Sequence, residues 1–327
     1  MNYRTFGKLG WKTSEISFGA WAIGGGWGEQ DDTESLRTLH RALDLGVTCI
    51  DTAAGYGNGR SERLISQVLK ERKPSGDRIY VATKTPPAPG DWPPSPYDSW
   101  EERYSERYLR QNIEERLRSL GTDTIDLLQL HTWTRAWNRN PQPFALLRTL
   151  QKEGKIRAIG VSTPEHDQNS VIDLMRGGWV DSVQVIYNLF EQEPAAELLP
   201  VAQETGTAII VRVAFDEGVL TGKFKEDTTF PDGDFRQRYF QGDRIRRAVQ
   251  RAAAIEPDLV GTGLTLPEAA LKFALAHPAV STVIPGMRRV SQADANCSVS
   301  EKPNLTDVQL KRLQRHRWNR GLWYPGK

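Results

Sequence analysis

The chain has 327 residues, 43 of them basic and 41 acidic, so its formal net charge at pH 7 is only +2. No stretch concentrates basic residues enough to indicate binding to nucleic acid or to a membrane surface, and no apolar run reaches the ~18 residues of a transmembrane helix. With two cysteines and no apolar N-terminal segment typical of a secretory signal, the sequence predicts a soluble cytoplasmic protein that acts on small molecules.

Short apolar runs recur along the whole chain. Two brief runs within residues 3–16, separated by Gly7 and Gly10, predict a hairpin that precedes the first of these runs. The following runs are mostly apolar instead of alternating, as expected for strands that are covered on both faces. They span residues 16–20, 47–51, 79–84, 125–131, 156–162, 182–187, 208–213 and 280–284.

Segments with the spacing of amphipathic helices separate the predicted strands. They span residues 32–45, 61–70, 104–120, 144–152, 168–175, 195–205, 267–276 and 291–296. Strands that alternate with helices form either a closed barrel or an open doubly wound sheet. Because no long linker interrupts the alternation, we expect a (β/α)8 TIM barrel that occupies residues 1–327 as a single domain.

Three segments that follow predicted strands, residues 85–100, 132–143 and 214–243, are much longer than ordinary connections of about 4–6 residues. They follow the C-terminal ends of the strands, where barrels carry their active sites. We expect long aromatic loops on this face to form the wall of a substrate pocket. Candidate wall residues are Trp27, Trp92 and Trp133, with Trp137, Trp318, Trp323 and Tyr324 as further candidates. A cluster of arginines at positions 244, 246, 247 and 251 is predicted to be a solvated helix face.

Ionisable residues end three neighbouring strands, namely Asp51, Lys84 and His131, and Tyr56 follows Asp51 by five positions. In a parallel barrel these ends lie on one face, so the four side chains are expected to converge. Asp51 and Lys84 would pair, and Lys84 would favour the phenolate of Tyr56 and raise its acidity. Tyr56 would then protonate a carbonyl oxygen while hydride reaches the carbon, with His131 donating to the same oxygen. A structural ion pair and a core histidine are the alternative interpretation.

A dinucleotide would need a site other than a Rossmann fold, because the sequence contains no G-x-G-x-x-G motif. The glycines of Gly218–Lys223 would permit close approach of backbone amides to phosphates, and Lys223 would add charge. Arg288 and Arg289, which follow Gly286, would bind a 2′-phosphate. An ordinary turn and a solvated helix start are the alternatives for these two segments.

At these residues the chain resembles the aldo-keto reductase superfamily, in particular the bacterial NADP-dependent branch that also includes channel beta subunits. The matching segments cover nearly the whole chain: FGAWAIGGGWG, CIDTAAGYGNGRSERLI, VATK, IDLLQLH, KEGKIRAIGVS, QVIYN, GVLTGKF and VIPGMRR. The resemblance implies that Asp51, Tyr56, Lys84 and His131 form a catalytic tetrad. It also implies that NADPH binds in an extended conformation on the barrel.

The resemblance further implies a set of cofactor-binding residues. They are Trp21, Ser162, Gln184, Arg212, Gly218, Leu220, Lys223, Gly286, Arg288, Gln292 and Asn296. Three positions depart from the pattern: Thr163 stands where asparagine is frequent, Arg212 where an aromatic residue stacks on nicotinamide, and Ala295 where an acidic residue is frequent. These departures affect the expected cofactor preference more than the chemistry. No metal is expected, since the five histidines lack ligand spacing.

The expected function is NADPH-dependent reduction of an aldehyde or ketone, including sugars and other small carbonyl compounds, to an alcohol by hydride transfer. The same residues also suit an NADP-dependent dehydrogenase of sugars or alcohols that works in the oxidative direction. Two interpretations from other classes remain: a Schiff-base aldolase with Lys84 as nucleophile, and a non-catalytic NADPH-binding module.

Overall fold

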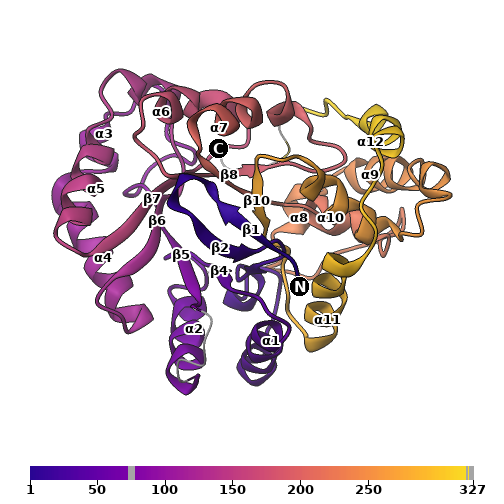
Figure 1. Ribbon diagram of the computed structural model, residues 1–327, viewed down its shortest axis with the longest axis horizontal. Coiled ribbons are helices and arrows are strands. Elements are labelled where there is room, and N and C mark those ends of the chain that lie inside the picture. The colour runs from indigo at the N-terminus through magenta and orange to yellow at the C-terminus, as the bar shows by residue number, and fades with distance from the viewer. Residues whose placement is uncertain (73–77, 322, 324–327) are drawn as a thin grey trace.

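The computed structural model describes residues 1–72, 78–321 and 323. Its parallel strands form one curved sheet in the order β10-β9-β8-β7-β6-β5-β4-β3, surrounded by helices (Figure 1). The strands are β3 (Phe18–Gly19), β4 (Cys49–Asp51), β5 (Tyr80–Thr85), β6 (Ile125–Leu130), β7 (Ile156–Ser162), β8 (Ser182–Ile186), β9 (Ala208–Arg212) and β10 (Val280–Val283). Each of the eight predicted strands overlaps one of them.

The two edge strands meet and close the sheet. The backbone N–H of Ser17 donates to the carbonyl of Val283 at 2.8 Å, and that of Gly19 donates to the carbonyl of Pro285 at 3.1 Å. Gly19 is needed for this approach, because a Cβ atom there would lie 2.5 Å from the carbonyl oxygen of Ile284. The sheet is therefore the expected (β/α)8 barrel.

The predicted helices are present with ends shifted by a few residues. They are α1 (Asp32–Asp44), α2 (Arg60–Glu71), α4 (Glu106–Leu120), α5 (Gln142–Lys152), α6 (Ile172–Arg176), α7 (Leu198–Thr205), α10 (Leu266–Ala276), α11 (Val290–Ser298) and the tail helix α12 (Asp307–Leu313). Three more helices lie within or directly after the long loops: α3 (Trp100–Arg103), α8 (Arg236–Tyr239) and α9 (Arg244–Ala253). None of the helices in the described ranges is long and apolar enough to cross a bilayer.

Short 3₁₀ helices connect many of these elements. They are η1 (Gly7–Leu9), η2 (Ala22–Gly24), η3 (Arg135–Arg139), η4 (Gln168–Val171), η5 (Glu193–Ala195), η6 (Asp216–Thr221), η7 (Glu256–Leu259), η8 (Val299–Glu301) and η9 (Gln314–His316). The predicted helix over residues 168–175 is thus split into η4 and α6. The predicted helix over residues 195–205 begins later, at Leu198.

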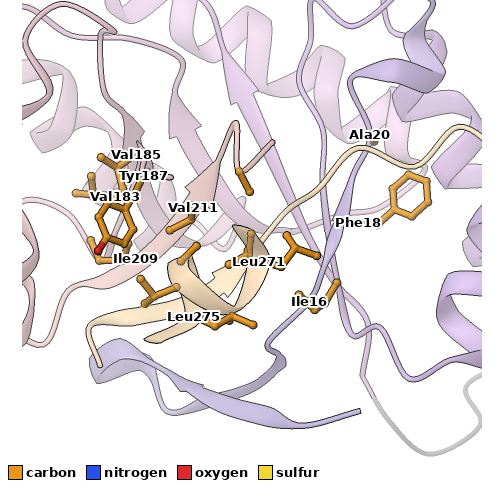
Figure 2. Close-up of a cluster of buried hydrophobic side chains, with 14 of the residues drawn as sticks. Ile16, Phe18, Ala20, Val183, Val185, Tyr187, Ile209, Val211, Leu271 and Leu275 are labelled. Carbon is orange, nitrogen blue, oxygen red and sulfur yellow. The ribbon is translucent and has the colours of Figure 1, made fainter. Parts of the chain in front are cut away.

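The main core lies between the strands and the surrounding helices. Figure 2 shows Val211 of β9 near Leu271 and Leu275 of α10, and Val183 and Val185 of β8 next to Tyr187 and Ile209 in the same cluster. Alternate residues of the same strands face the barrel interior, and several of these interior residues are polar. The strands thus bury both faces, one against helices and one against a partly polar interior.

The N-terminal hairpin closes one end of the barrel. Its strands are β1 (Tyr3–Phe6) and β2 (Trp11–Ser14), and Figure 1 shows it lying across the centre of the ring of helices. Phe6 is buried in an apolar cluster with inward-facing strand residues, including Leu127 and Ile210. Because this end is filled, any pocket in the barrel must open at the opposite end, where the strands have their C-termini.

The C-terminal tail is covered by the arginine cluster of α9. Trp318 and Trp323 are buried, and the guanidinium carbons of Arg247 and Arg251 lie 5.7 and 5.1 Å from the centroid of the Trp318 ring. The predicted solvated arginine face is exposed at Arg246, Arg247 and Arg251, and its flat guanidinium groups also pack on indole rings. The predicted pocket residue Tyr324 lies outside the described residues.

Candidate active site

The four residues expected to react are brought together at the open end of the barrel. Asp51 ends β4, Lys84 lies near the end of β5, His131 directly follows β6, and Tyr56 lies in the turn before α2. The ammonium of Lys84 donates to Asp51 Oδ1 at 2.5 Å, to the carbonyl of Thr52 at 2.9 Å and to the hydroxyl of Tyr56 at 3.2 Å. All three N–H groups of this fully buried lysine are therefore used.

A glycine and a serine hold the turn that carries Tyr56. Gly57 has a φ of +61°, and a Cβ atom there would lie 2.1 Å from the carbonyl oxygen of Gly24. The hydroxyl of Ser61 donates to the carbonyl of Ala20 at 3.0 Å, which ties the start of α2 to the residue that follows β3. The glycine and serine of the YGNGRS segment thus fix the backbone around Tyr56 by close packing.

Burial and charge act in opposite directions on Tyr56. Burial raises its pKa above the ordinary value of 10.0, and the nearby Lys84 opposes this only in part. The expectation of a more acidic phenol was therefore wrong for this structure, because loss of hydration outweighs the ammonium charge. Burial disfavours the charged form of Lys84 too, but Asp51 and Tyr56 hold its pKa above the ordinary value. At neutral pH Tyr56 is a protonated donor beside a charged lysine.

His131 is neutral in this site. Burial, followed by the charges of Lys84 and Arg212, holds its pKa well below the ordinary value of 6.5. Its ring lies edge-on to Tyr56 and Trp92, with centroid distances of 5.9 and 5.1 Å. A neutral imidazole carries one N–H donor, so His131 can hydrogen-bond an oxygen that lies beside the Tyr56 hydroxyl.

Replacing His131 with glutamine is expected to reduce the loss of stability on acidification. Below about pH 6.5 the unfolded chain binds a proton at His131 and the folded protein does not, so the free energy of unfolding falls by up to about 1.4 kcal/mol per pH unit. Above about pH 6.5 His131 is neutral in both the folded and the unfolded chain, so it causes no loss of stability there. Urea unfolding of wild type and variant at pH 7 and 5.5 measures it, with exposed His166→Gln as control. Equal pH dependence of wild type and His131→Gln would show that folded His131 accepts the proton.

Asp51 has two further partners, one of which the sequence interpretation missed. Its Oδ2 accepts from Gln184 Nε2 at 2.7 Å and from Gln129 Nε2 at 3.2 Å. Gln129 is buried on β6, and Gly160 on β7 leaves room for it, since a Cβ atom there would lie 2.9 Å from Gln129 Cγ. The signal for Gln129 was its position two residues before His131, on the same face of the strand.

A pocket of about 380 Å³ opens above these residues. Asp51, Tyr56 and His131 line it, and Trp21, Trp27, Trp92 and Phe235 form aromatic walls. Its volume is in the ordinary range for a small-molecule site, and its walls are mostly apolar with a few polar groups. The predicted wall residues Trp27 and Trp92 thus lie at the pocket.

Trp133 lies elsewhere, and the structure contradicts its prediction as a pocket wall. It is 0% exposed and packs against Trp137 and Phe144, with ring centroids 5.1 and 4.8 Å away. Its indole N–H donates to Asn138 Oδ1 at 2.8 Å. The loop after β6 folds back over α5, so Trp133 and Trp137 both serve its packing.

The residues predicted to bind a cofactor divide into two groups. Most of those expected near the nicotinamide or along the phosphates line the pocket: Trp21, Ser162, Gln184, Arg212, Gly218 and Gly286. The side chain of Leu220 is instead buried in the core, and Lys223 is exposed at the surface. Leu220 therefore offers only its backbone to a ligand.

Arg288 is held at the start of α11 by the loop after β3. Its guanidinium donates to the carbonyls of Trp27 at 2.7 Å and Glu29 at 2.6 Å, and its Nε donates to Gln30 at 2.8 Å. Two of its predicted partners are also linked here: Gln292 Oε1 accepts from the Arg288 N–H at 2.7 Å, and Asn296 Nδ2 donates to the carbonyl of Gly286 at 3.4 Å. These contacts form two pairs, Arg288 with Gln292 and Asn296 with Gly286, and Gly286 itself lines the pocket.

Arg212 forms an ion pair at the pocket wall. Its Nη2 donates to the carbonyl of Thr163 at 3.0 Å and to Glu165 Oε1 at 3.2 Å, and both Arg212 and Glu165 line the pocket. Its buried Nε has no hydrogen-bond partner in the part of the chain that the structure describes. A planar cation with an unused donor therefore lies at the position where the resemblance leads us to expect an aromatic side chain.

Comparison with known proteins decides the family. The model of the Aldo/keto reductase family matches residues 15–317. The chain belongs to this family. It is 32% identical over 302 residues to the aldo-keto reductase YhdN of Bacillus subtilis, which covers 90% of this chain and 87% of that protein.

Two further relatives differ from each other in activity. The NADH-specific methylglyoxal reductase of Escherichia coli is 28% identical over 310 residues, covering 90% of this chain and 92% of that protein. The structure of the glycerol dehydrogenase AKR11B4 from Gluconobacter oxydans superimposes with a TM-score of 0.77 at 29% identity, covering 96% of this chain and 94% of that one. This aldo-keto reductase is thus an oxidoreductase of carbonyl compounds or alcohols.

Proposed function

We propose that this aldo-keto reductase reduces an aldehyde or ketone to an alcohol with NADPH, and that Tyr56 is the proton donor. The observation that carries the proposal is the chain of contacts from Asp51 through Lys84 to the Tyr56 hydroxyl, which opens into an aromatic pocket. A carbonyl oxygen in the pocket would accept hydrogen bonds from Tyr56 and neutral His131. Bound NADPH supplies the hydride.

The protein's own groups account for the proton transfer. Tyr56 keeps its proton at neutral pH because its pKa is raised by burial. When it gives the proton to the developing alkoxide, the resulting phenolate lies 3.2 Å from the Lys84 ammonium, and Asp51 holds that ammonium charged and in position. The pair thus stabilises charge that appears only during the reaction.

The residues along the pocket fit a nicotinamide dinucleotide. Ser162 and Gln184 provide polar groups for a carboxamide, and the guanidinium of Arg212 provides a flat surface for a ring. Gly218 and Gly286 let backbone approach phosphates closely. Arg288, Gln292 and Asn296 would hold the adenosine 2′-phosphate, which would compete with backbone carbonyls for Arg288.

NADPH is expected to bind about tenfold or more tightly than NADH, because a charge-assisted bond from Arg288 to the 2′-phosphate contributes roughly 1.5–3 kcal/mol. Arg288→Leu should weaken NADPH binding more than NADH binding, because both nucleotides lose the anchored Trp27 loop but only NADPH loses a partner for its 2′-phosphate. Quenching of tryptophan fluorescence measures both affinities, since Trp21, Trp27 and Trp92 line the pocket.

The matched control for this experiment is Arg41→Ala, which removes an arginine on α1 that pairs with Asp294 of α11 outside the pocket. A clear preference for NADH, which the name of the Escherichia coli relative describes for that protein, would agree with a reductase. It would contradict the proposed role of Arg288 in binding the 2′-phosphate. Binding of neither nucleotide would contradict the proposed function.

Oxidation of an alcohol by the same residues is the second candidate, favoured by the likeness to glycerol dehydrogenase AKR11B4. Comparing initial rates with NADPH plus aldehydes and with NADP⁺ plus alcohols at one pH decides the direction.

The aldolase interpretation has less support, because Lys84 is charged and all its N–H groups are engaged. Borohydride trapping of a substrate on Lys84 would support the aldolase interpretation. A binding module would show no turnover dependent on Tyr56.

A further inference from the structure

The C-terminal tail reaches back to the loop that follows β9. Arg320, which lies beyond η9, forms a two-pronged ion pair with Asp216, the first residue of η6: Nη1 donates to Oδ2 at 2.6 Å, and Nη2 donates to Oδ1. The two side chains are 8% and 0% exposed. A buried pair that joins residues 104 positions apart restrains both segments to a single relative position.

The backbone beside Asp216 is strained. Asp216 and Glu217 have φ values of +48° and +56°, and Gly218 follows at +102°. Non-glycine residues rarely adopt this left-handed conformation, so two of them in succession persist only where surrounding contacts impose it. Glu217 and Gly218 both line the pocket. The strained turn therefore sets the shape of the pocket wall at this point.

The tail itself is anchored independently of Asp216. The Trp318 N–H donates to the carbonyl of Phe190 at 3.0 Å, and the Trp318 and Trp323 rings pack together with centroids 5.1 Å apart. Trp323 also packs on Tyr239, at 5.7 Å. Arg320 lies between two buried tryptophans, so its guanidinium acts from a fixed position.

We propose that Arg320 is a positioning residue for the cofactor: by holding Asp216, it keeps the Glu217–Gly218 turn in the conformation that covers the bound dinucleotide and slows its release. This inference rests on the proposed function, in which Gly218 approaches the cofactor phosphates. Arg320 itself does not line the pocket and acts through Asp216. The tail is thereby a determinant of cofactor affinity.

A purely structural role is the competing explanation, and the charges allow the two to be separated. Removing Arg320 alone leaves the Asp216 carboxylate buried without its guanidinium, which destabilises the fold whatever the function of the pair. Replacing both partners with uncharged residues avoids that penalty and keeps the net charge of the protein. The double variant still lacks the two-pronged restraint on the turn.

The experiment compares wild type with Arg320→Met and with the double variant Arg320→Met/Asp216→Asn. Fluorescence titration gives the NADPH Kd, stopped-flow displacement gives its dissociation rate, and thermal unfolding reports stability. Both variants are expected to raise the Kd about tenfold, mainly through faster dissociation. The double variant should recover most of the stability. The kcat at saturating NADPH and carbonyl should not fall, because the reacting groups are untouched.

Arg251→Met is the control, since Arg251 also stacks on Trp318 but makes none of the contacts with Asp216. It should leave the NADPH Kd unchanged. If Arg320→Met fails to fold, the double variant still carries the test. A double variant that binds NADPH as tightly as wild type would overturn the inference and leave the proposed function intact. Failure of wild type to bind either nucleotide would overturn both.

Discussion

Replacing Tyr56 with phenylalanine is expected to abolish carbonyl reduction while leaving NADPH binding largely intact. The ring would keep its edge-on contact with His131, at 5.9 Å between centroids, and only the hydroxyl beside Lys84 would be lost. A positioned general acid typically contributes about 10²–10⁴ in rate. We expect kcat/KM to fall by about 10²-fold or more, with the NADPH Kd within about twofold of wild type. Steady-state kinetics and fluorescence titration measure the two quantities.

Tyr104→Phe is the matched control for this prediction. Tyr104 is also fully buried, and its hydroxyl donates to the carbonyl of Thr132 at 3.0 Å, away from the pocket. Its loss should lower stability by about 0.5–1.5 kcal/mol and leave the rate nearly unchanged. Near-normal activity of Tyr56→Phe would show that the proton comes from another group, and His131 would be the next residue to test.

The arrangement of the site could be predicted because it follows from topology. Asp51 and Lys84 lie at the ends of apolar strands, and parallel strands in a barrel bring their C-terminal ends to one face. The spacing of apolar residues was enough to locate all eight strands. It overestimated the length of β3, which has only Phe18 and Gly19, because closure against β10 uses isolated bridges around it.

Other interactions between side chains far apart in the sequence could not be predicted in this way. The sequence does not show that Gln184 donates to Asp51, or that Arg288 donates to the loop after β3. Trp133 follows a strand just as Trp92 does, yet one is packed in the core and the other lines the pocket. Such differences depend on how each long loop folds back, which local periodicity does not encode.

The pKa of Tyr56 is another property that the sequence alone could not predict. The topology correctly predicted that Lys84 lies close to Tyr56, and the lysine charge does act to lower the pKa of Tyr56, although the pKa is raised on balance. Burial acts more strongly in the opposite direction, and the degree of burial depends on the packing of the whole pocket. In the proposed mechanism, Tyr56 therefore acts as a protonated phenol whose conjugate base is stabilised, and not as a phenol that is ionised in advance.

Lys84→Met is expected to have the second large effect, on both rate and stability. The variant leaves the Asp51 carboxylate buried without its cation, and breaking such a pair costs about 3–5 kcal/mol. It also removes the charge that stabilises the Tyr56 phenolate, so the rate of reduction should fall by more than about 10². Chemical unfolding and single-turnover kinetics at saturating NADPH measure these two losses.

The double variant Lys84→Met/Asp51→Asn separates stability from catalysis. An amide at position 51 still accepts a hydrogen bond from Gln129 or Gln184 and carries no charge, so most of the lost stability should return. The rate should stay low, because Tyr56 still lacks its ammonium partner. Recovery of the rate together with stability would show that Lys84 serves only the fold, and that Tyr56 releases its proton without help from a neighbouring cation.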